Sequence, residues 1–250
     1  MTVAITGATG FVGSALSTKL TALGVKVIPA VRNATGLPDE IVTGDLGVST
    51  SMNCQSALSV CDAVVHLAAR VHVMHDDIAD PLKEFRKVNV DGTLRLAREA
   101  AAAGVQRFVF ISSIKVNGES TLPRSPFTAN QTPAPSDPYG VSTWEAEQRL
   151  LALATEKGME VVIIRPVLVY GPDVKANFLN MMKWLYKGIP LPFGAIHNKR
   201  SMVALDNLVD LIVTCIDHPK AANQTFLVSD DDDLSTTDLL RRMGRALGRP

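Results

Sequence analysis

The chain has 250 residues, 46% of them hydrophobic, and its 25 basic and 25 acidic side chains leave no net charge at neutral pH. This length and apolar content predict a large folded domain with a substantial core and argue against a disordered protein. The balanced charge argues against a protein that binds nucleic acid or a membrane surface, although a local basic cluster would escape this count.

A glycine-rich turn opens the chain. Residues 3–6 predict a short buried strand, and Gly7, Gly10 and Gly13 follow at intervals of three into a helix that Gly24 ends. The first glycine permits a tight turn, the second lets the backbone approach a pyrophosphate, and the third lets the helix pack against the strand. Free N–H groups and the positive end of the helix dipole also favour phosphate, so the turn predicts a dinucleotide site.

Strands and helices then alternate, which is typical of a parallel sheet covered on both faces. Further strands are expected at 26–31, 41–43, 63–67, 107–112 and 161–165. Helices are expected at 81–103, 139–157, 177–187, 205–217 and 239–247, with a proline-rich loop at 119–138. We predict an α/β fold, a Rossmann-type doubly wound parallel sheet over 1–171. A small and incomplete C-terminal substrate-binding lobe is expected over 172–250, of which 195–217 packs back on the Rossmann domain.

Several short motifs along the chain carry a resemblance to a known family. They are Thr6-Gly-Ala-Thr-Gly-Phe-Val-Gly13, Gly44-Asp-Leu46, His66-Leu-Ala-Ala69, Asn89-Val-Asp-Gly-Thr93, Ser113, Tyr139, Arg165-Pro166, Tyr170-Gly-Pro172, and Arg200 ahead of Asp206. With them the chain resembles the extended short-chain dehydrogenase/reductase family, in its NAD-dependent epimerase/dehydratase branch acting on nucleotide sugars. The motifs cover almost the whole chain and indicate the family, but they do not indicate one substrate.

The resemblance implies roles for the matching residues. Tyr139 would be the general acid/base, Ser113 would hydrogen-bond the substrate hydroxyl, and position 143 would complete the catalytic set. The candidate dinucleotide-binding residues are Gly7, Gly10, Phe11, Val12, Gly13, Arg32, Asp45, Leu46, Leu67, Ala68, Ala69, Asn89, Ser112, Tyr139, Pro166 and Val169. The candidate substrate-binding residues are Ser113, Lys115, Asn177 and Arg200, the last two at the nucleotide diphosphate.

One departure from the family lies on the catalytic helix. A lysine one turn after the tyrosine lowers the pKa of the phenol and holds the nicotinamide ribose in the family, whereas this chain has Thr143. At about 6 Å from the phenol and an effective dielectric constant of about 20, the missing charge is worth on the order of 3 kcal/mol, or about two pKa units. We therefore expect slow turnover or none, with weakened cofactor binding, and Lys115 is the nearby cation that could substitute.

Other positions bear on substrate affinity and on the choice between NAD and NADP. Leu168 stands where many nucleotide-sugar enzymes of the family place an asparagine, and the chain ends at Pro250, earlier than its relatives, so substrate affinity should suffer. Arg32 follows the second strand, where an acidic residue selects NAD and an arginine tolerates the 2′-phosphate of NADP. Epimerases of this type normally use NAD, whereas Arg32 suggests that NADP is accepted. The two indications conflict, so the sequence leaves both NAD and NADP as possible cofactors. His66 is expected to be a packed core residue, while His72 and His75 could line the sugar pocket.

We predict a UDP-hexose type nucleotide-sugar 4-epimerase that transfers a hydride reversibly at C4 through a 4-keto intermediate. Arg32 favours an alternative, an NADP-dependent nucleotide-sugar 4-reductase or dehydrogenase, and Thr143 favours a second, a non-catalytic NAD(P)-binding protein. A 4,6-dehydratase is disfavoured because Ile114 and Lys115 stand where such enzymes have an acidic pair. We further expect a homodimer with no metal, no nucleic-acid partner and no membrane insertion. The missing signal peptide and the unclustered cysteines predict a cytoplasmic protein.

Overall fold

A computed structural model describes residues 1–37, 39–48, 54–71, 80–122, 125–174, 176–189, 194 and 196–249. The chain forms two compact units. Unit 1 comprises Met1–Pro166 and Val209–Leu227, and unit 2 comprises Val167–Leu208 and Val228–Pro250.

Unit 1 is built on a seven-stranded sheet of order β3-β2-β1-β4-β5-β6-β9. The strands are β1 (Thr2–Thr6), β2 (Lys26–Val31), β3 (Ile41–Val42), β4 (Ala63–His66), β5 (Arg107–Ile111), β6 (Glu160–Pro166) and β9 (Thr225–Val228). Neighbouring strands from β3 to β6 pair in parallel. The strand order reverses between β1 and β4, and the carboxyl ends of these strands therefore open a crevice for a ligand.

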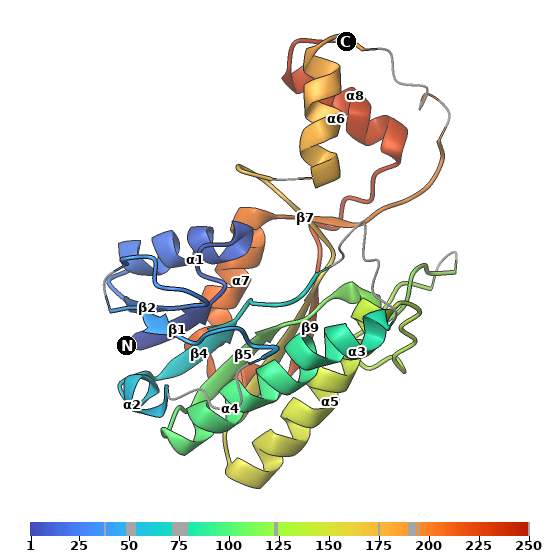
Figure 1. Ribbon diagram of the computed structural model, residues 1–250. Helices are drawn as coiled ribbons and strands as arrows, with labels where there is room; N and C mark the ends of the chain where they lie inside the picture. Colours follow the sequence, from blue (N-terminus) through green and yellow to red (C-terminus); the bar gives the residue numbers. More distant parts are fainter. Residues whose placement is uncertain are drawn as a thin grey trace. The chain divides into compact units, whose positions relative to one another are not determined.

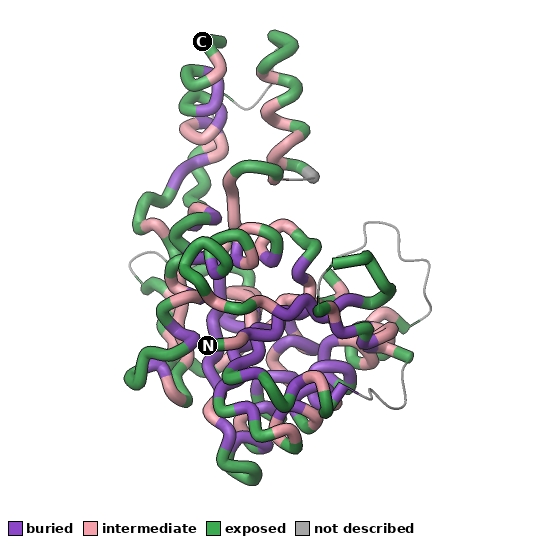
Figure 2. The backbone as a smooth tube through the Cα atoms, turned by 90° about the vertical axis from the view of Figure 1, so that its left-hand side faces the viewer, coloured by how far each residue is buried: buried purple, intermediate pink, exposed green. Residues whose placement is uncertain are grey.

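Helices cover both faces of this sheet, with α1 (Phe11–Ala22) and α7 (Leu205–Asp217) on one face (Figure 1). On the other face lie α2 (Gln55–Leu58), α3 (Pro81–Phe85), α4 (Thr93–Ala102) and α5 (Pro138–Lys157). The strands at the centre of unit 1 are almost wholly buried, as Figure 2 shows in purple. This layering explains why their sequences are continuous apolar runs without a polar face.

The observed strands differ from the five expected after the opening one by no more than one residue at each end. Strand β9 was not expected, because it is only four residues long and these residues are half-buried. The helix expected at 81–103 is continuous, but its middle, the segment η1 (Arg86–Gly92), is π-helical. A π segment widens the helix locally and often marks a functional position. It was not expected because the spacing of apolar residues along it resembles that of an α-helix.

Unit 2 contains a two-stranded parallel sheet of β7 (Leu168–Tyr170) and β8 (Met202–Ala204) and the helices α6 (Ala176–Tyr186) and α8 (Thr236–Ala246). The Asp230 carboxylate joins the two strands, since it accepts hydrogen bonds from the Tyr170 hydroxyl and the Ala204 N–H, both at 2.9 Å. The Ser235 hydroxyl caps α8 by accepting from the Asp238 N–H at 2.9 Å. Neither short strand was expected from the sequence.

Three further observations bear on compartment and partners. Cys54, Cys61 and Cys215 are buried free thiols, and burial raises the pKa of each to about 11. In the part of the chain that the structure describes, the helices are too short or too polar to cross a bilayer. The same part contains no cluster of histidine, cysteine and acidic side chains that could hold a metal ion.

Candidate active site

The opening turn is shaped by its glycines. Gly7 has a φ of +68°, and a Cβ there would lie 3.1 Å from the Ala68 nitrogen. A Cβ at Gly13 would overlap the Gly7 carbonyl and lie 2.9 Å from the Ala8 Cα. Gly10 donates its N–H to the Gly7 carbonyl at 2.9 Å and begins α1 without a side-chain cap. The N–H groups of the first helical turn, which starts at Phe11 and Val12, are therefore available to an anion.

A cavity of about 530 Å³ lies beside this turn, at the carboxyl ends of β1, β2, β3 and β4. Eight of the predicted dinucleotide-binding residues line it: Gly7, Gly10, Arg32, Asp45, Leu46, Leu67, Ala68 and Ala69. The Asp45 carboxylate accepts the Gly47 N–H at 2.7 Å and lies 3.9 Å from Arg32 Nε. The Arg32 side chain is 71% exposed, so it leaves room for either a ribose hydroxyl or a phosphate at this end.

His66 joins the opening turn to the middle of the site. It is 1% exposed, and its ring lies between the Thr6 hydroxyl, 2.6 Å from Nδ1, and the Thr93 hydroxyl, 2.9 Å from Nε2. The Thr6 oxygen already accepts the Leu67 and Ala68 N–H groups, so its proton is donated to Nδ1. Burial lowers the pKa of His66 to about 3, and the ring is neutral. The expected packed histidine is confirmed.

Tyr139 and Ser113 come together at the carboxyl end of β5. The Asp137 side chain caps α5 by accepting the Gly140 N–H at 2.6 Å, which places Tyr139 in the first helical turn. Burial raises the pKa of the Tyr139 phenol, while hydrogen bonds with Ser113 and Thr143 oppose that rise. The net pKa stays above its ordinary value, so the phenol is overwhelmingly protonated at neutral pH.

Thr143 lies next to Tyr139 on the same face of α5. It is 3% exposed, and its hydroxyl donates to the Tyr139 carbonyl at 2.8 Å. A small cavity of about 10 Å³ remains beside it, enough for about one water molecule. This cavity is lined by Ala68, Ala69, Asn89, Thr93, Phe110, Ile111, Tyr139 and Thr143. Because Ala68 and Ala69 also line the large cavity, the two cavities adjoin beside the phenol.

Asn89, on the π-helical segment, ties the backbone around this small cavity. Its Oδ1 accepts the Arg70 N–H at 2.8 Å, and its Nδ2 donates to the Arg70 carbonyl at 3.0 Å and to the Ser142 hydroxyl at 3.1 Å. The chain after β4 is thereby fastened to α5. A Cβ at Gly92 would lie 2.7 Å from the Leu46 carbonyl, so the same segment also packs tightly under the large cavity.

Lys115 follows Ser113 in a short 3-10 turn, but two carboxylates hold its side chain. Its ammonium donates to Asp137 and, at 3.1 Å, to Glu119. These partners raise the pKa of Lys115 and offset its charge at the phenol, where Asp137 acts in the opposite direction to Lys115. Lys115 is therefore a weaker substitute for the family lysine than its place in the sequence suggests.

A buried polar network beneath Ser113 was not expected from the sequence. Its members are Ser112, Asn117, Glu147 and Arg165, all of them buried. A signal was present, because Glu147 lies four residues after Thr143 and therefore on the same face of α5. Arg165 follows four buried apolar residues in β6, which is a rare position for an unpaired charge.

The remaining predicted residues lie elsewhere. Pro166 is buried at the end of β6 in unit 1. Val169, Asn177 and Arg200 belong to unit 2, where Asn177 and Arg200 are exposed and Val169 is half-buried in β7. His72 and His75 lie outside the described residues.

Comparisons with known proteins agree with this geometry. The profile of the NAD dependent epimerase/dehydratase family matches residues 3–229. The chain is 54% identical over 250 residues to the UDP-glucose 4-epimerase of Vibrio cholerae, covering 98% of this chain and 76% of that protein. It is 28% identical over 250 residues to the N-acetyl-alpha-D-glucosaminyl-diphospho-ditrans,octacis-undecaprenol 4-epimerase of Escherichia coli O157:H7, covering 99% and 72%. A solved structure, MoeE5 in complex with UDP-glucose and NAD, shares 26% identity at a TM-score of 0.83 over 100% of this chain and 83% of that one. The predicted Rossmann-type fold is confirmed.

Proposed function

The chain belongs to the NAD-dependent epimerase/dehydratase family, and from this premise we propose that it is a nucleotide-sugar 4-epimerase of the UDP-hexose type. One observation carries the proposal: the Tyr139 phenol, hydrogen-bonded with Ser113, lines a small cavity that shares Ala68 and Ala69 with the large cavity at the glycine turn. The similarity to the Vibrio cholerae enzyme supports UDP-glucose and its C4 epimer as the substrate pair.

The residues around the large cavity fit NAD. The uncapped start of α1 and the glycines that leave no room for a Cβ suit a pyrophosphate, and Asp45 and Leu46 would lie at the adenine. Leu67, Ala68 and Ala69 would line the path toward the phenol. When bound, NAD supplies an acceptor that takes up a hydride and can return it. The solved structure of MoeE5 with NAD supports this choice of cofactor.

In the proposed mechanism Tyr139 moves the proton. The phenolate takes the proton of the sugar C4 hydroxyl while C4 loses its hydride, which leaves a 4-keto sugar. Ser113 donates a hydrogen bond to the same sugar oxygen and fixes its position. After the keto sugar has presented its other face, the hydride returns to C4, and Tyr139 gives the proton back to oxygen. The stereochemistry at C4 is then inverted with no net oxidation.

The ionisation of Tyr139 limits this mechanism at neutral pH. With a pKa above its ordinary value, fewer than about one phenol in a thousand is ionised at pH 7. Thr143 hydrogen-bonds the phenol but cannot supply the charge of a lysine, and its hydroxyl also serves the Tyr139 carbonyl. We therefore infer slow epimerisation that accelerates toward alkaline pH.

The experiment that tests the proposal is an epimerisation assay by proton NMR. The purified chain is incubated with NAD and UDP-glucose at neutral and alkaline pH, beside the Thr143→Lys and Tyr139→Phe variants. We expect UDP-galactose to form slowly with the native chain, faster with Thr143→Lys, and not at all with Tyr139→Phe. If even Thr143→Lys with bound NAD forms none from UDP-glucose or UDP-N-acetylglucosamine, the proposal fails.

The elevated pKa of Tyr139 favours a second candidate, a protein that binds the dinucleotide without turning it over. In that case the native chain would bind NAD, as measured by calorimetry, and would form no epimer at any pH up to the ionisation of the phenol. The same assay therefore separates the two functions. Net consumption of NADPH with a 4-keto sugar would instead favour the reductase that Arg32 suggests.

The substrate contacts in unit 2 are part of the proposal. Asn177 at the start of α6 and Arg200 before β8 are exposed polar residues that suit a nucleotide diphosphate. Replacing Arg200 with alanine should raise KM for the UDP-sugar about tenfold, with kcat nearly unchanged, because a diphosphate contact acts in the ground and transition states alike.

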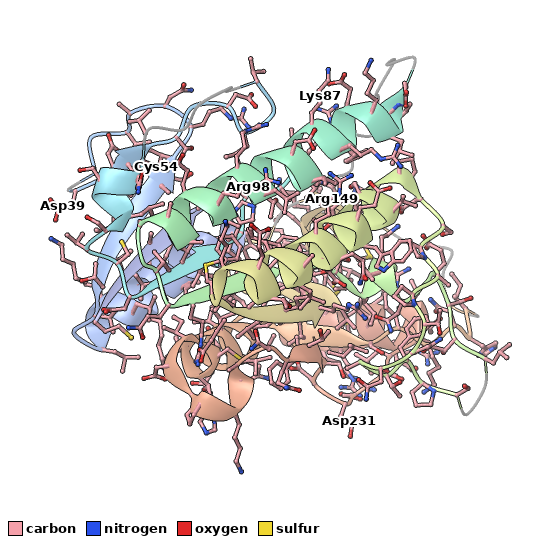
Figure 3. All side chains as sticks on the ribbon, turned by 90° about the horizontal axis from the view of Figure 1, so that it is seen from below. Asp39, Cys54, Lys87, Arg98, Arg149 and Asp231 are labelled. Carbon is pink, nitrogen blue, oxygen red and sulfur yellow. The ribbon has the colours of Figure 1, made fainter. Side chains whose placement is uncertain are left out.

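A homodimer is also proposed, through the helix pair that flanks the phenol. The helices α4 and α5 pack side by side in unit 1 (Figure 1), with Arg98 on α4, Arg149 on α5 and Lys87 on η1, the segment that precedes α4 (Figure 3). Asp91 lies 3.8 Å from Arg149, so both signs of charge are present for a two-fold partner. Sedimentation equilibrium tests the proposed homodimer, and a monomer at both low and high salt would contradict it.

The buried free thiols support a reducing compartment such as the cytoplasm.

A further inference from the structure

Glu147 and Arg165 form a buried ion pair beneath the end of β5. Their side chains are 1% and 5% exposed, respectively, and Arg165 approaches both oxygens of the carboxylate, with Nε 2.9 Å from Oε1. A bidentate pair of this kind has a defined geometry, because the planar guanidinium matches the carboxylate. Buried ion pairs are weak evidence for stability, since the cost of removing both charges from water offsets much of their attraction.

The pair holds the chain on both sides of Ser113. On one side, the Ser112 hydroxyl donates to Glu147 Oε1. On the other side, Arg165 Nη1 donates to Asn117 Oδ1 at 3.0 Å. Ser113 lies between these two anchors, at the start of the 3-10 turn η2 (Ile114–Val116), and its hydroxyl reaches the Tyr139 phenol.

The same pair is also linked to Tyr139 through α5. Glu147 follows Tyr139 by eight residues on the same helix, about 12 Å along the axis, and therefore does not touch the reacting atoms. A change at Glu147 can act on the phenol by two routes, through its charge or through the position of Ser113. The two routes have opposite signs, which makes them separable.

We propose that the Glu147–Arg165 pair is a positioning element that fixes the Ser113 hydroxyl against the Tyr139 phenol. This inference rests on the proposed epimerase function for its purpose, but its geometry does not depend on turnover. A second arginine–glutamate pair, in which the Glu160 side chain is 42% exposed, provides a control. Arg107 and Glu160 stand opposite each other as the first residues of β5 and β6, about 17 Å away along the strands, at the sheet edge remote from the phenol.

The test is carbon-13 NMR of the chain labelled at the tyrosine ring carbon that bears the hydroxyl. Only three tyrosines are present, and the Tyr139 signal is the one lost in Tyr139→Phe. At a fixed alkaline pH, we expect Ser113→Ala to lower the ratio of ionised to neutral Tyr139 about tenfold, since a hydrogen bond to a charged group is lost. We expect Glu147→Gln to lower the ratio in the same direction, because Ser113 loses its anchor.

The control and the double variant decide between the routes. Glu160→Gln should leave the ratio unchanged. In the Ser113→Ala background, Glu147→Gln should not lower the ratio further, because only the effect of its lost charge remains and that effect raises the ratio. Removing the negative charge of Glu147 would by itself favour ionisation, so a raised ratio in Glu147→Gln overturns the proposal. An unchanged ratio, or effects that add in the double variant, overturns it as well.

Ser112→Ala keeps the test decisive if the buried Glu147→Gln variant does not fold. It removes one anchor and leaves the ion pair intact, so a smaller decrease of the same sign is expected, and no decrease contradicts the proposal. The measurement needs neither cofactor nor substrate. A chain that never epimerises would refute the proposed function while leaving this result to stand or fall by itself.

Discussion

The two cavities of the site differ in what builds them. The large one, of about 530 Å³, is shaped by backbone at the ends of four strands and by glycines that exclude a Cβ. The small one, of about 10 Å³, is enclosed by side chains, among them Tyr139 and Thr143. A phosphate site made of backbone tolerates most side-chain changes, whereas proton transfer depends on single groups and their charges. Binding and catalysis can therefore be separated in this chain.

The largest expected effect is on the backbone-built cavity. In Gly13→Ala the new Cβ overlaps the Gly7 carbonyl, so the turn and the start of α1 must move apart. We expect NAD affinity to fall by at least about a hundredfold, or about 2.7 kcal/mol, as measured by calorimetry. Gly24→Ala is the control, because Gly24 has a φ of +75° but faces open space. It should cost about 1 kcal/mol of stability without changing NAD affinity; equal losses of affinity in both variants would contradict this account.

The next effect is confined to the small cavity. Thr143→Lys places an ammonium next to the phenol, and we expect the midpoint of the pH–rate profile to fall by about two units. Thr143→Met is the control, since it fills the same space without a charge and should not shift the midpoint. If methionine shifts the midpoint as lysine does, packing rather than charge sets the ionisation of Tyr139.

The two cavities also differ in how far the sequence predicts them. The glycine turn is a local sequence pattern. At Gly7 and Gly13 the structure contains the backbone constraints that require glycine. The strands flanking it are continuous apolar runs, and their bounds were predicted closely. The β9 strand was not, because four half-buried residues leave no clear periodicity.

Around the phenol, sequence patterns indicate residue types but not contacts. The departure at Thr143 was visible by comparison with a family motif, and the structure adds that its hydroxyl also serves the backbone. Nothing local links Glu147 to Ser112 or Arg165, which are 35 and 18 residues away in the chain. Likewise, the two carboxylates that hold Lys115 could not be assigned until the loop before α5 was placed.

His66 connects the two cavities, and its expected effect is intermediate. Its pKa of about 3 in the folded chain lies below that of the unfolded chain, which therefore binds a proton more readily. Stability is unaffected above about pH 7 and falls as the pH drops below about 6.5, by about 1.4 kcal/mol per unit. Urea unfolding at pH 7 and pH 5 should show a loss of about 2 kcal/mol more in the native chain than in His66→Gln. Equal losses in both chains would show that His66 does not contribute.

The smallest expected effect is on cofactor choice at the far end of the large cavity. Arg32 is 71% exposed and lies 3.9 Å from Asp45, so its guanidinium is partly offset and remains open to solvent. A 2′-phosphate would gain one charge-assisted contact there, while a ribose hydroxyl would gain little. We expect Arg32→Ala to weaken NADP binding about tenfold, or about 1.4 kcal/mol, and to leave NAD binding within about a factor of two. Calorimetric titration with both dinucleotides measures the ratio, and an unchanged ratio would mean that Asp45, which stays in place, sets the preference between the two cofactors.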